Sequence, residues 1–216
     1  MMTHDPSSSS KGRLPSDAAR HVCPWWLGYA LASPIRRLFE SPERLLGPYV
    51  RPGMTIVEPG CAMGYFSVPM ARMVGAEGRV VCVDLQQKMI DGLLRRARRA
   101  GVADRISARV CAGDDLGLAT FRGAADLVVA IHMIHEVPDR QRLLQQLSDT
   151  LRPGGTLLVL EPRGHVPVDD FARTLAMAEQ AGLKPTGASP SGRSRGAVLV
   201  KDGARSLDEA GSRVPQ

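Results

Sequence analysis

Hydrophobic and polar positions alternate in blocks between residues 54 and 201. Short apolar runs alternate with longer segments in which apolar residues recur every three to four positions. Continuous apolar runs are typical of parallel strands covered on both faces, and the longer segments are typical of amphipathic helices. The strand-like runs are MTIVEPG, RVVCVDL, ISARVCAGDD, AADLVVAIHM and TLLVLEP. The pattern predicts an α/β fold, a doubly wound and mostly parallel sheet in a three-layer α-β-α arrangement.

The C-terminal part of the pattern differs from the rest. VDDFARTLAMAEQAGL predicts a helix ended by Gly182, and weaker strands follow near LKPTGAS and GAVLVK. The connection PSGRSR is too short for a helical crossover, so these two strands form an antiparallel hairpin. We therefore expect one antiparallel strand near the C-terminus.

The ends of the chain lack the core pattern. Residues 1–18 are polar and predict a disordered arm, and residues 202–216 predict a flexible tail. Residues 19–50 contain helical stretches broken by prolines, with a helix start at Ser41 and Pro42. We expect this segment to be an N-terminal helical lid on a core at residues 51–201.

Apolar run length and cysteine spacing indicate the compartment in which the protein is expected. No apolar run approaches the roughly 18 residues that cross a bilayer, and no apolar leader opens the chain. The four cysteines form no C-x-x-C pair, which favours a reduced, cytoplasmic protein. Cys23 is the cysteine outside the core strands.

The net charge of +6 could indicate a protein that binds nucleic acid. Its densest source is the segment KMIDGLLRRARRAG, where helical spacing places Arg95, Arg96, Arg98 and Arg99 on the outward side. No aromatic residue lies among these arginines to stack on bases, so we interpret them as a solvated helix face. Neither nucleic acid nor a membrane is an expected partner.

The loop EPGCAMG, residues 58–64, joins the first strand to a helix. Ligands of doubly wound sheets bind at this place, and Gly60 and Gly64 would let a ligand approach the backbone N–H groups. A plain tight turn is the structural alternative. A dinucleotide fingerprint requires glycine at 60, 62 and 65, but the chain has Ala62 and Tyr65. This mismatch argues against NAD or FAD.

Five motifs in order resemble the class I S-adenosylmethionine-dependent methyltransferases, small-molecule type, similar to the ubiquinone/menaquinone C-methyltransferase-like group. They are an acidic residue before a G-x-G-x-G-like loop, an acidic residue ending strand two, Gly-Asp after strand three, DLVVAIHMIHEVPD, and LRPGGTLLVLEP. Alanine replaces the middle glycine of the first motif. The resemblance covers roughly residues 50–201 and implies a Rossmann-like fold with S-adenosylmethionine as the cofactor.

The resemblance implies roles for individual residues on the cofactor. Asp84 would accept hydrogen bonds from the ribose hydroxyls, Asp114 or Asp115 would accept from the adenine amino group, and Leu85 would pack on the ring. Glu58 would orient the turn or reach the methionine amino group. Asp84, Asp114 and Asp115 could instead cap a helix or loop. The complete expected set is Glu58, Gly60, Cys61, Ala62, Gly64, Asp84, Leu85, Asp114 and Asp115.

Acceptor chemistry is expected after strands four and five. Methyl transfer needs alignment and exclusion of water, and it needs a base when the nucleophile starts protonated. The catalytic candidates are His132, Glu161 and His165, and the substrate or lid candidates are Trp25, Trp26, Tyr29 and His135. A metal site built from the three histidines and Glu161 is not expected, because their spacing matches no known ligand pattern.

These features predict an enzyme that transfers methyl from S-adenosylmethionine to a small-molecule acceptor. An Asn/Asp-Pro-Pro-Tyr-like run, which marks methylation of amino groups in nucleic acid or protein, is absent after strand four. One alternative is a methyltransferase-like partner or regulatory protein that binds the cofactor without catalysis. A second is an NAD-dependent oxidoreductase.

Overall fold

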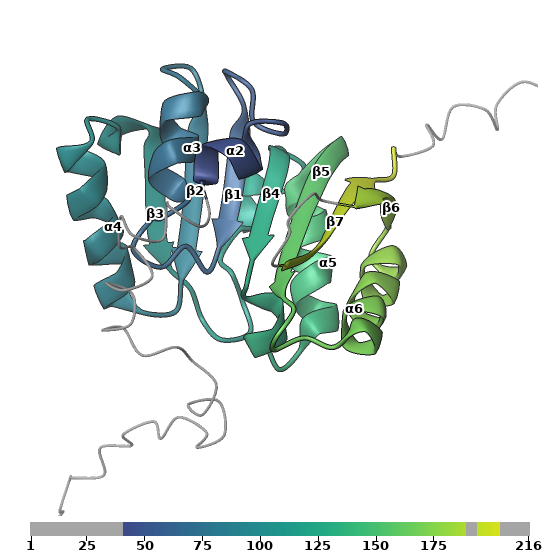
Figure 1. The fold of residues 1–216 in the computed structure, drawn as a ribbon. Coiled ribbons are helices and arrows are strands. Elements are labelled where there is room, and N and C mark those ends of the chain that lie inside the picture. The colour runs from purple at the N-terminus through teal and green to yellow at the C-terminus, as the bar shows by residue number, and fades with distance from the viewer. Residues whose placement is uncertain (1–40, 189–193, 204–216) are drawn as a thin grey trace, which may run out of the picture.

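The computed structural model describes residues 41–188 and 194–203 of the 216-residue chain. Its centre is a seven-stranded sheet with the strand order β3-β2-β1-β4-β5-β7-β6 (Figure 1). The strands are β1 (Thr55–Pro59), β2 (Arg79–Asp84), β3 (Ile106–Val110), β4 (Ala125–Ile131), β5 (Leu151–Pro162), β6 (Leu183–Ala188) and β7 (Ser194–Lys201). All strands except β7 run in the same direction, which confirms the mostly parallel sheet with one antiparallel strand.

Helices cover both faces of the sheet. Figure 1 shows α2, α3 and α4 on one face and α5 and α6 on the other, which confirms the three-layer prediction. The helices are α2 (Pro42–Leu46), α3 (Ser67–Met73), α4 (Gln87–Arg99), α5 (Arg140–Thr150) and α6 (Val168–Gln180). Short 3-10 turns are η3 (Ala103–Arg105), η4 (Ala119–Phe121) and η5 (Ile134–Glu136).

The core consists of one apolar layer on each face of the sheet. Ile56 and Val57 are adjacent in β1 and point to opposite faces because side chains alternate along a strand. Ile56 packs in the layer beneath α2, α3 and α4, together with Leu93. Val57 packs in the layer beneath α5 and α6, together with Leu147. Burial on both faces explains the nearly continuous apolar runs in the sequence.

Strand order reverses at β1. The chain runs outward from β1 through β2 to β3, then returns to place β4 on the opposite side of β1. The loops after β1 and β4 therefore leave the sheet in different directions, and a crevice forms outside the strand ends at such a switch point. The predicted site residues of both loops lie at this edge.

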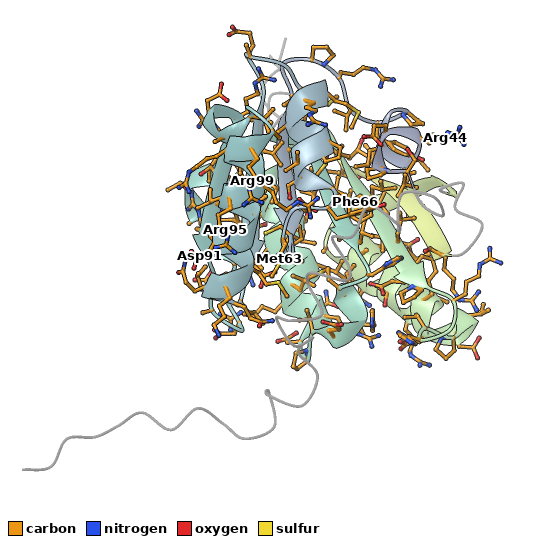
Figure 2. All side chains as sticks on the ribbon, turned by 60° about the vertical axis from the view of Figure 1, so that its left-hand side comes forward. Arg44, Met63, Phe66, Asp91, Arg95 and Arg99 are labelled. Atoms are coloured by element: carbon orange, nitrogen blue, oxygen red, sulfur yellow. The ribbon has the colours of Figure 1, made fainter. Side chains whose placement is uncertain are left out.

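Local signals set several element ends. The predicted helix start at residue 41 is confirmed, since Ser41 Oγ accepts from the Arg44 N–H at 3.3 Å and Pro42 occupies the first turn. On α4, Arg95 and Arg99 are exposed along one side (Figure 2). Arg96 differs from the prediction and is half-buried, because it lies beside the buried stripe of the helix.

The RPGG segment, residues 152–155, has the Pro-Gly pair that is typical of a turn, but it is part of strand β5. β5 already begins at Leu151, which pairs with Ala125 of β4, and regular pairing resumes at Thr156 opposite Leu127. Residues 152–155 form an irregularity within the strand, where Gly154 has a φ of 74°. Arg152 Nε holds it by donating to Asp126 Oδ1 at 2.7 Å.

Some predictions lie outside the described residues. They concern the arm at 1–18, most of the lid segment and tail, and four residues, namely Cys23, Trp25, Trp26 and Tyr29. Within the described part of the chain, no helix combines the length and apolar character needed to span a membrane.

Candidate functional site

The loop after β1 is attached to β2 through its backbone. The N–H groups of Gly60 and Cys61 donate to the Val83 carbonyl at 2.8 and 3.2 Å. Gly64 has a φ of 78°, and a Cβ there would lie 2.3 Å from Leu93 Cδ1. The missing side chain at 64 therefore lets α4 pack closely, a role in packing that the sequence analysis did not assign to it.

Ala62 adopts a left-handed backbone with a φ of 46°. A methyl group in this region costs roughly 1 kcal/mol, which gives a physical reason for glycine in the G-x-G-x-G pattern. The conformation turns the Ala62 N–H toward β2, where it donates to Asp84 Oδ2 at 2.9 Å. The departure from the family pattern thus strains the loop without breaking its contact with Asp84.

Asp84 ends β2 and is 9% exposed. Its two carboxylate oxygens accept from the backbone N–H groups of Ala62 and Gln86, each at 2.9 Å. Burial raises its pKa, and the backbone hydrogen bonds oppose that rise. A carboxylate has about four lone-pair positions, so room remains for two more donors.

Glu58 lies on β1 and is 4% exposed. Ser67 Oγ of α3 donates to Glu58 Oε2, and the Cys82 thiol lies 3.9 Å from the same oxygen. Burial, together with the nearby Asp84 carboxylate, raises the pKa of Glu58 to about 8, although the hydrogen bonds with Ser67 and Cys82 oppose this rise. The pKa of Cys61 is also raised well above its usual value, first by a hydrogen bond with Cys82 and then by burial. We call Glu58, residues 60–64 and Asp84 the β1–β2 end.

The remaining cofactor candidates lie on the surface. Leu85 is 45% exposed beside Asp84, and Val110 of β3, which the sequence analysis did not single out, is exposed opposite Asp84. Asp114 faces solvent and pairs with Arg142 at 3.6 Å. Asp115 Oδ1 accepts from the Gly117 N–H at 2.8 Å, so this carboxylate supports its own loop.

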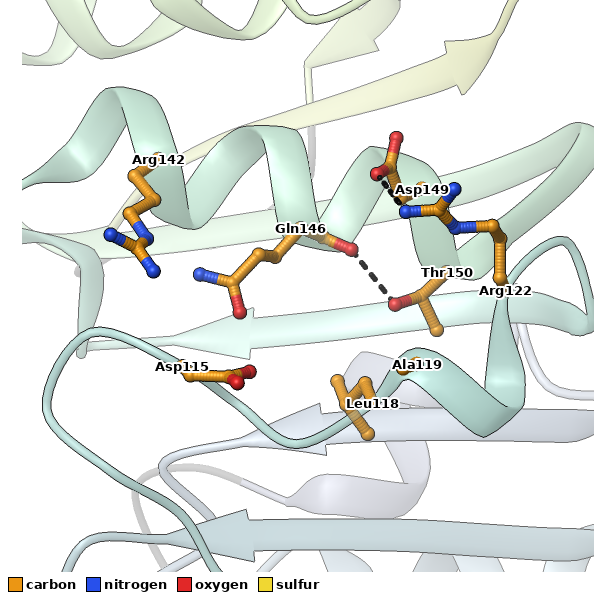
Figure 3. Close-up of a pocket in the computed structure, with 8 residues that line it drawn as sticks. All are labelled: Asp115, Leu118, Ala119, Arg122, Arg142, Gln146, Asp149 and Thr150. Atoms are coloured by element: carbon orange, nitrogen blue, oxygen red, sulfur yellow. Dashed lines mark hydrogen bonds and ion pairs between the residues drawn. The ribbon is translucent and has the colours of Figure 1, made fainter.

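Asp115 also lines a pocket of about 210 Å³ between its loop and α5 (Figure 3). The lining residues are Asp115, Leu118, Ala119, Arg122, Arg142, Gln146, Asp149 and Thr150. No residue of the β1–β2 end is among them. Asp115 and the 60–64 loop therefore do not share this pocket.

His132 follows β4 and has a left-handed φ of 55°. Its N–H donates to the Leu160 carbonyl at 2.7 Å, and its ring Nε2 lies 2.8 Å from Ser194 Oγ on β7. Sequence analysis missed Ser194, which lies 62 positions further along the chain. The ring nitrogen of His132 is therefore already engaged in a contact with the antiparallel strand.

His135 and Glu161 form an ion pair at the ends of β4 and β5. Glu161 is 1% exposed, and its Oε1 accepts from the Ile134 N–H at 2.9 Å. Its Oε2 accepts from His135 Nδ1, and this bond raises the pKa of the imidazole. The His165 ring lies 6.1 Å from the His135 ring, between centroids. We call His132, His135, Glu161 and His165 the β4–β5 end.

The two members of this pair differ in access. Glu161 is buried and each of its oxygens accepts one hydrogen bond, whereas the His135 side chain is 19% exposed. No described residue makes a hydrogen bond to His135 Nε2. Of this pair, the His135 side chain is therefore the one that a ligand could reach. Among the described residues, no three metal-ligating side chains cluster.

Glu136 is a further titratable group at the end of β4, within the turn η5. It lies next to His135, and burial raises the pKa of its carboxyl while the imidazole opposes that rise.

Comparison with known proteins matches residues 56–155 to a family described as a methyltransferase domain. The matched range runs from β1 into β5, so it includes the β1–β2 end and both His132 and His135.

Curated relatives have methyltransferase names. A ubiquinone/menaquinone biosynthesis C-methyltransferase of Haemophilus ducreyi is 32% identical over 114 residues, covering 52% of this chain and 42% of that protein. A ubiquinone biosynthesis O-methyltransferase of Xanthomonas campestris pv. campestris is 30% identical over 138 residues, covering 62% and 54%. The chain therefore spans about half the length of these relatives.

A solved S-adenosylmethionine-dependent methyltransferase from Aquifex aeolicus shares the fold. Its TM-score is 0.74 at 18% identity, and the match covers 83% of this chain and 99% of that one. Fold and strand-end residues together define a doubly wound, Rossmann-like α/β domain. More particularly, residues 56–155 match the methyltransferase domain family, and this match, the curated relatives and the shared fold together support a class I S-adenosylmethionine-dependent methyltransferase. S-adenosylmethionine is the cofactor of this class, which confirms the predicted family and cofactor.

Proposed function

We propose that the protein transfers a methyl group from S-adenosylmethionine to a small-molecule acceptor. The observation that carries this proposal is the buried Asp84 carboxylate, held by the Ala62 N–H against the 60–64 loop at the switch point of the sheet. This is where a nucleoside cofactor binds in a doubly wound fold.

The residues present fit the cofactor. Asp84 uses one lone pair of each oxygen for a backbone N–H, and the others suit the paired hydroxyls of a ribose. The exposed Leu85 side chain offers an apolar surface for the adenine ring. Asp114 and Asp115 remain candidates for its amino group. Gly60, Cys61, Ala62 and Gly64 form the loop beside the methionine part.

His135 is the proposed base, and Glu161 positions it. Bound S-adenosylmethionine supplies an electrophilic methyl group on a sulfonium that leaves as a neutral sulfide. His135 Nε2 accepts the proton of the acceptor O–H or N–H, while Nδ1–H stays donated to Glu161. The carboxylate stabilises the resulting imidazolium, which later releases its proton to solvent. This assignment moves the base from His132 and His165 to His135.

The acceptor is proposed as a small molecule for two reasons. The segment IHMIHEVPD follows β4 in place of a run for amino groups of macromolecules. The relatives named above have names from ubiquinone and menaquinone biosynthesis. A cytoplasmic location is part of the proposal, because Cys61, Cys82 and Cys111 are free thiols, as is usual in a reducing compartment.

Calorimetric titration tests the cofactor site. S-adenosylmethionine and S-adenosylhomocysteine should both bind, and NAD should not. Asp84→Asn keeps the shape but removes the charge, and we expect about 10- to 100-fold weaker binding of both nucleosides, since hydrogen bonds to a charged group contribute about 1.5–3 kcal/mol. Asp91→Asn is the matched control on the exposed side of α4. Tight NAD binding, or an unchanged Asp84→Asn affinity, would contradict the proposal.

Turnover separates an enzyme from a cofactor-binding partner protein. The purified chain, supplied with S-adenosylmethionine and a small-molecule metabolite extract, should form S-adenosylhomocysteine. Binding without any product would instead favour the regulatory alternative.

A further inference from the structure

The segment at residues 111–118 joins β3 to the turn η4 and forms neither helix nor strand. It carries Asp114 and Asp115, the candidates for the adenine amino group, and both are exposed. A segment without a regular hydrogen-bond pattern is held in place by individual contacts with its surroundings. The position of both carboxylates therefore depends on the groups that tie this segment to the rest of the domain.

One such group is Gln146 of α5, whose side-chain amide makes two hydrogen bonds with the backbone of the segment. Its Oε1 accepts from the Leu116 N–H at 2.9 Å, and its Nε2 donates to the Asp114 carbonyl at 3.1 Å. Figure 3 shows the Gln146 side chain extending from α5 toward the segment that carries Asp115. Because the amide both accepts and donates, it fixes the orientation of the segment as well as its distance from α5.

We propose that Gln146 is a positioning residue for the adenine end of the cofactor, because it holds residues 114–116 where an acid of this segment can meet the adenine amino group. This inference rests on the proposed function. Gln146 acts through the segment and is assigned no contact with the cofactor itself.

Other hydrogen bonds of the segment hold different parts of it. Asp115 Oδ1 accepts from the Gly117 N–H at 2.8 Å, a bond within the segment that moves with it. Arg109 of β3 donates to the Gly117 carbonyl at 3.1 Å on the exposed surface. The Cys111 N–H donates to the Asp84 carbonyl at 3.0 Å, so the start of the segment is attached to the residue proposed for the ribose.

Toward α5, Gln146 is the directional contact. An ion pair between Arg142 and Asp114 spans 3.6 Å, but the two side chains are 55% and 72% exposed, so screening by solvent leaves it weak. Leu116 is buried in the layer beneath α5, yet apolar packing has no preferred direction. The Gln146 amide is therefore the contact that sets which way the segment faces.

Gln146 also lines the pocket beside the segment, so its side chain borders on solvent and a change there should leave the packing of the core intact. Without its two hydrogen bonds, the segment would become ordered only when the ligand binds. The cost of that ordering reduces the affinity for the part of the ligand that the segment contacts. The loss should therefore fall on recognition of the adenine amino group.

Titration calorimetry with two ligands tests this assignment. The ligands are S-adenosylhomocysteine and its analogue with hydrogen in place of the adenine amino group. Gln146→Met keeps a similar side-chain length and removes both the donor and the acceptor. We expect about tenfold weaker binding of S-adenosylhomocysteine and a change below about twofold for the analogue, since two neutral hydrogen bonds are lost. Gln145→Met should change neither affinity, because Gln145 is exposed on the same helix and its amide donates to Asp149 within α5 at 3.0 Å.

Amide hydrogen exchange of the free protein supplies a readout that needs no ligand. The Leu116 N–H should exchange about tenfold faster in Gln146→Met than in the unaltered protein, while the Leu147 N–H of α5 keeps its protection and shows that the helix is intact. An unchanged Leu116 exchange rate, an unchanged affinity for S-adenosylhomocysteine, or equal losses for both ligands would overturn the inference while leaving the proposed cofactor site intact. If S-adenosylhomocysteine does not bind the unaltered protein, the proposed function fails instead, whatever the exchange of Leu116 shows.

Discussion

Glu58 and Glu161 invite comparison because their local sequences are alike and their surroundings are not. Each is the last but one residue of its strand and precedes the proline that ends it, and the two are 4% and 1% exposed. Glu58 meets a hydroxyl, a thiol and another carboxyl, whereas Glu161 meets a backbone N–H and an imidazole. Burial alone leads an acid to keep its proton, and a basic partner turns a similarly buried acid into a group that orients a base.

The same difference separates the two ends of the site. The β1–β2 end holds its groups through backbone N–H donors and lacks a cation among the described residues, so it suits a positively charged ligand. The β4–β5 end has histidines and an acid that pairs with one of them, so it suits proton transfer. The groups proposed for cofactor binding and those proposed for acceptor activation therefore differ in their electrostatic surroundings, although β1 and β4 are neighbouring strands.

The largest expected effect concerns stability at the β1–β2 end. The folded-state pKa of Glu58, about 8, lies above its ordinary value of 4.5, so stability falls as pH rises between these values and levels off above the higher one. Relative to Glu58→Gln, the unaltered protein should lose a few kcal/mol between about pH 5 and pH 9. The ceiling is about 5 kcal/mol at about 1.4 kcal/mol per unit. Urea denaturation of both proteins measures it, and a difference that is independent of pH would contradict the burial argument.

Removing the base at the β4–β5 end should be the largest kinetic effect. His135→Gln should lower turnover about 100-fold, the usual contribution of a general base, and leave S-adenosylmethionine affinity unchanged. The hydrogen bond with Glu161 raises the pKa of His135 from its ordinary value of 6.5, and a general base acts in its neutral form. The rate should therefore rise with pH through that raised pKa, and this limb should vanish in the variant. His165→Gln is the comparison variant. A larger loss of turnover in His165→Gln than in His135→Gln would assign the base to His165.

Altering the positioning acid should have a smaller effect of a different kind. Glu161→Gln keeps a hydrogen-bond acceptor for Nδ1–H but removes the charge that holds the His135 pKa up. We expect roughly tenfold slower turnover, together with a pH–rate profile shifted to lower pH. The full pH profile of S-adenosylhomocysteine formation measures both. A slower rate with an unmoved profile would indicate a merely structural role for Glu161.

The smallest expected effect is relief of backbone strain at Ala62. Ala62→Gly removes the left-handed penalty of roughly 1 kcal/mol, partly offset by the greater entropy of glycine in the unfolded chain. A gain below about 1 kcal/mol should appear as a higher midpoint in urea. Ala76→Gly, at an exposed position outside the left-handed region, should destabilise instead. Equal losses in both variants would remove strain as the explanation.

Much of the fold could be predicted from the sequence, because strands that are buried on both faces of a sheet consist almost entirely of apolar residues. The parallel strands were predicted from the apolar runs of β1, β2, β4 and β5. The antiparallel strand was predicted from the short connection before β7. Ser41 and Pro42 predicted a helix start through local capping chemistry. The irregular start of β5 was not predictable, since it depends on pairing between Leu151 and Ala125, residues of separate elements.

Sequence motifs also located the site, while the roles within it needed three dimensions. The family, the cofactor class and the position of Asp84 follow from residue types at fixed spacing after strands. That His135, rather than His132, faces a buried acid depends on how η5 and β5 meet, and that Ser194 engages His132 depends on an antiparallel strand far along the chain. A side chain's charge state and reactivity are set by its spatial neighbours, and one-dimensional patterns encode burial and turns but not those neighbours.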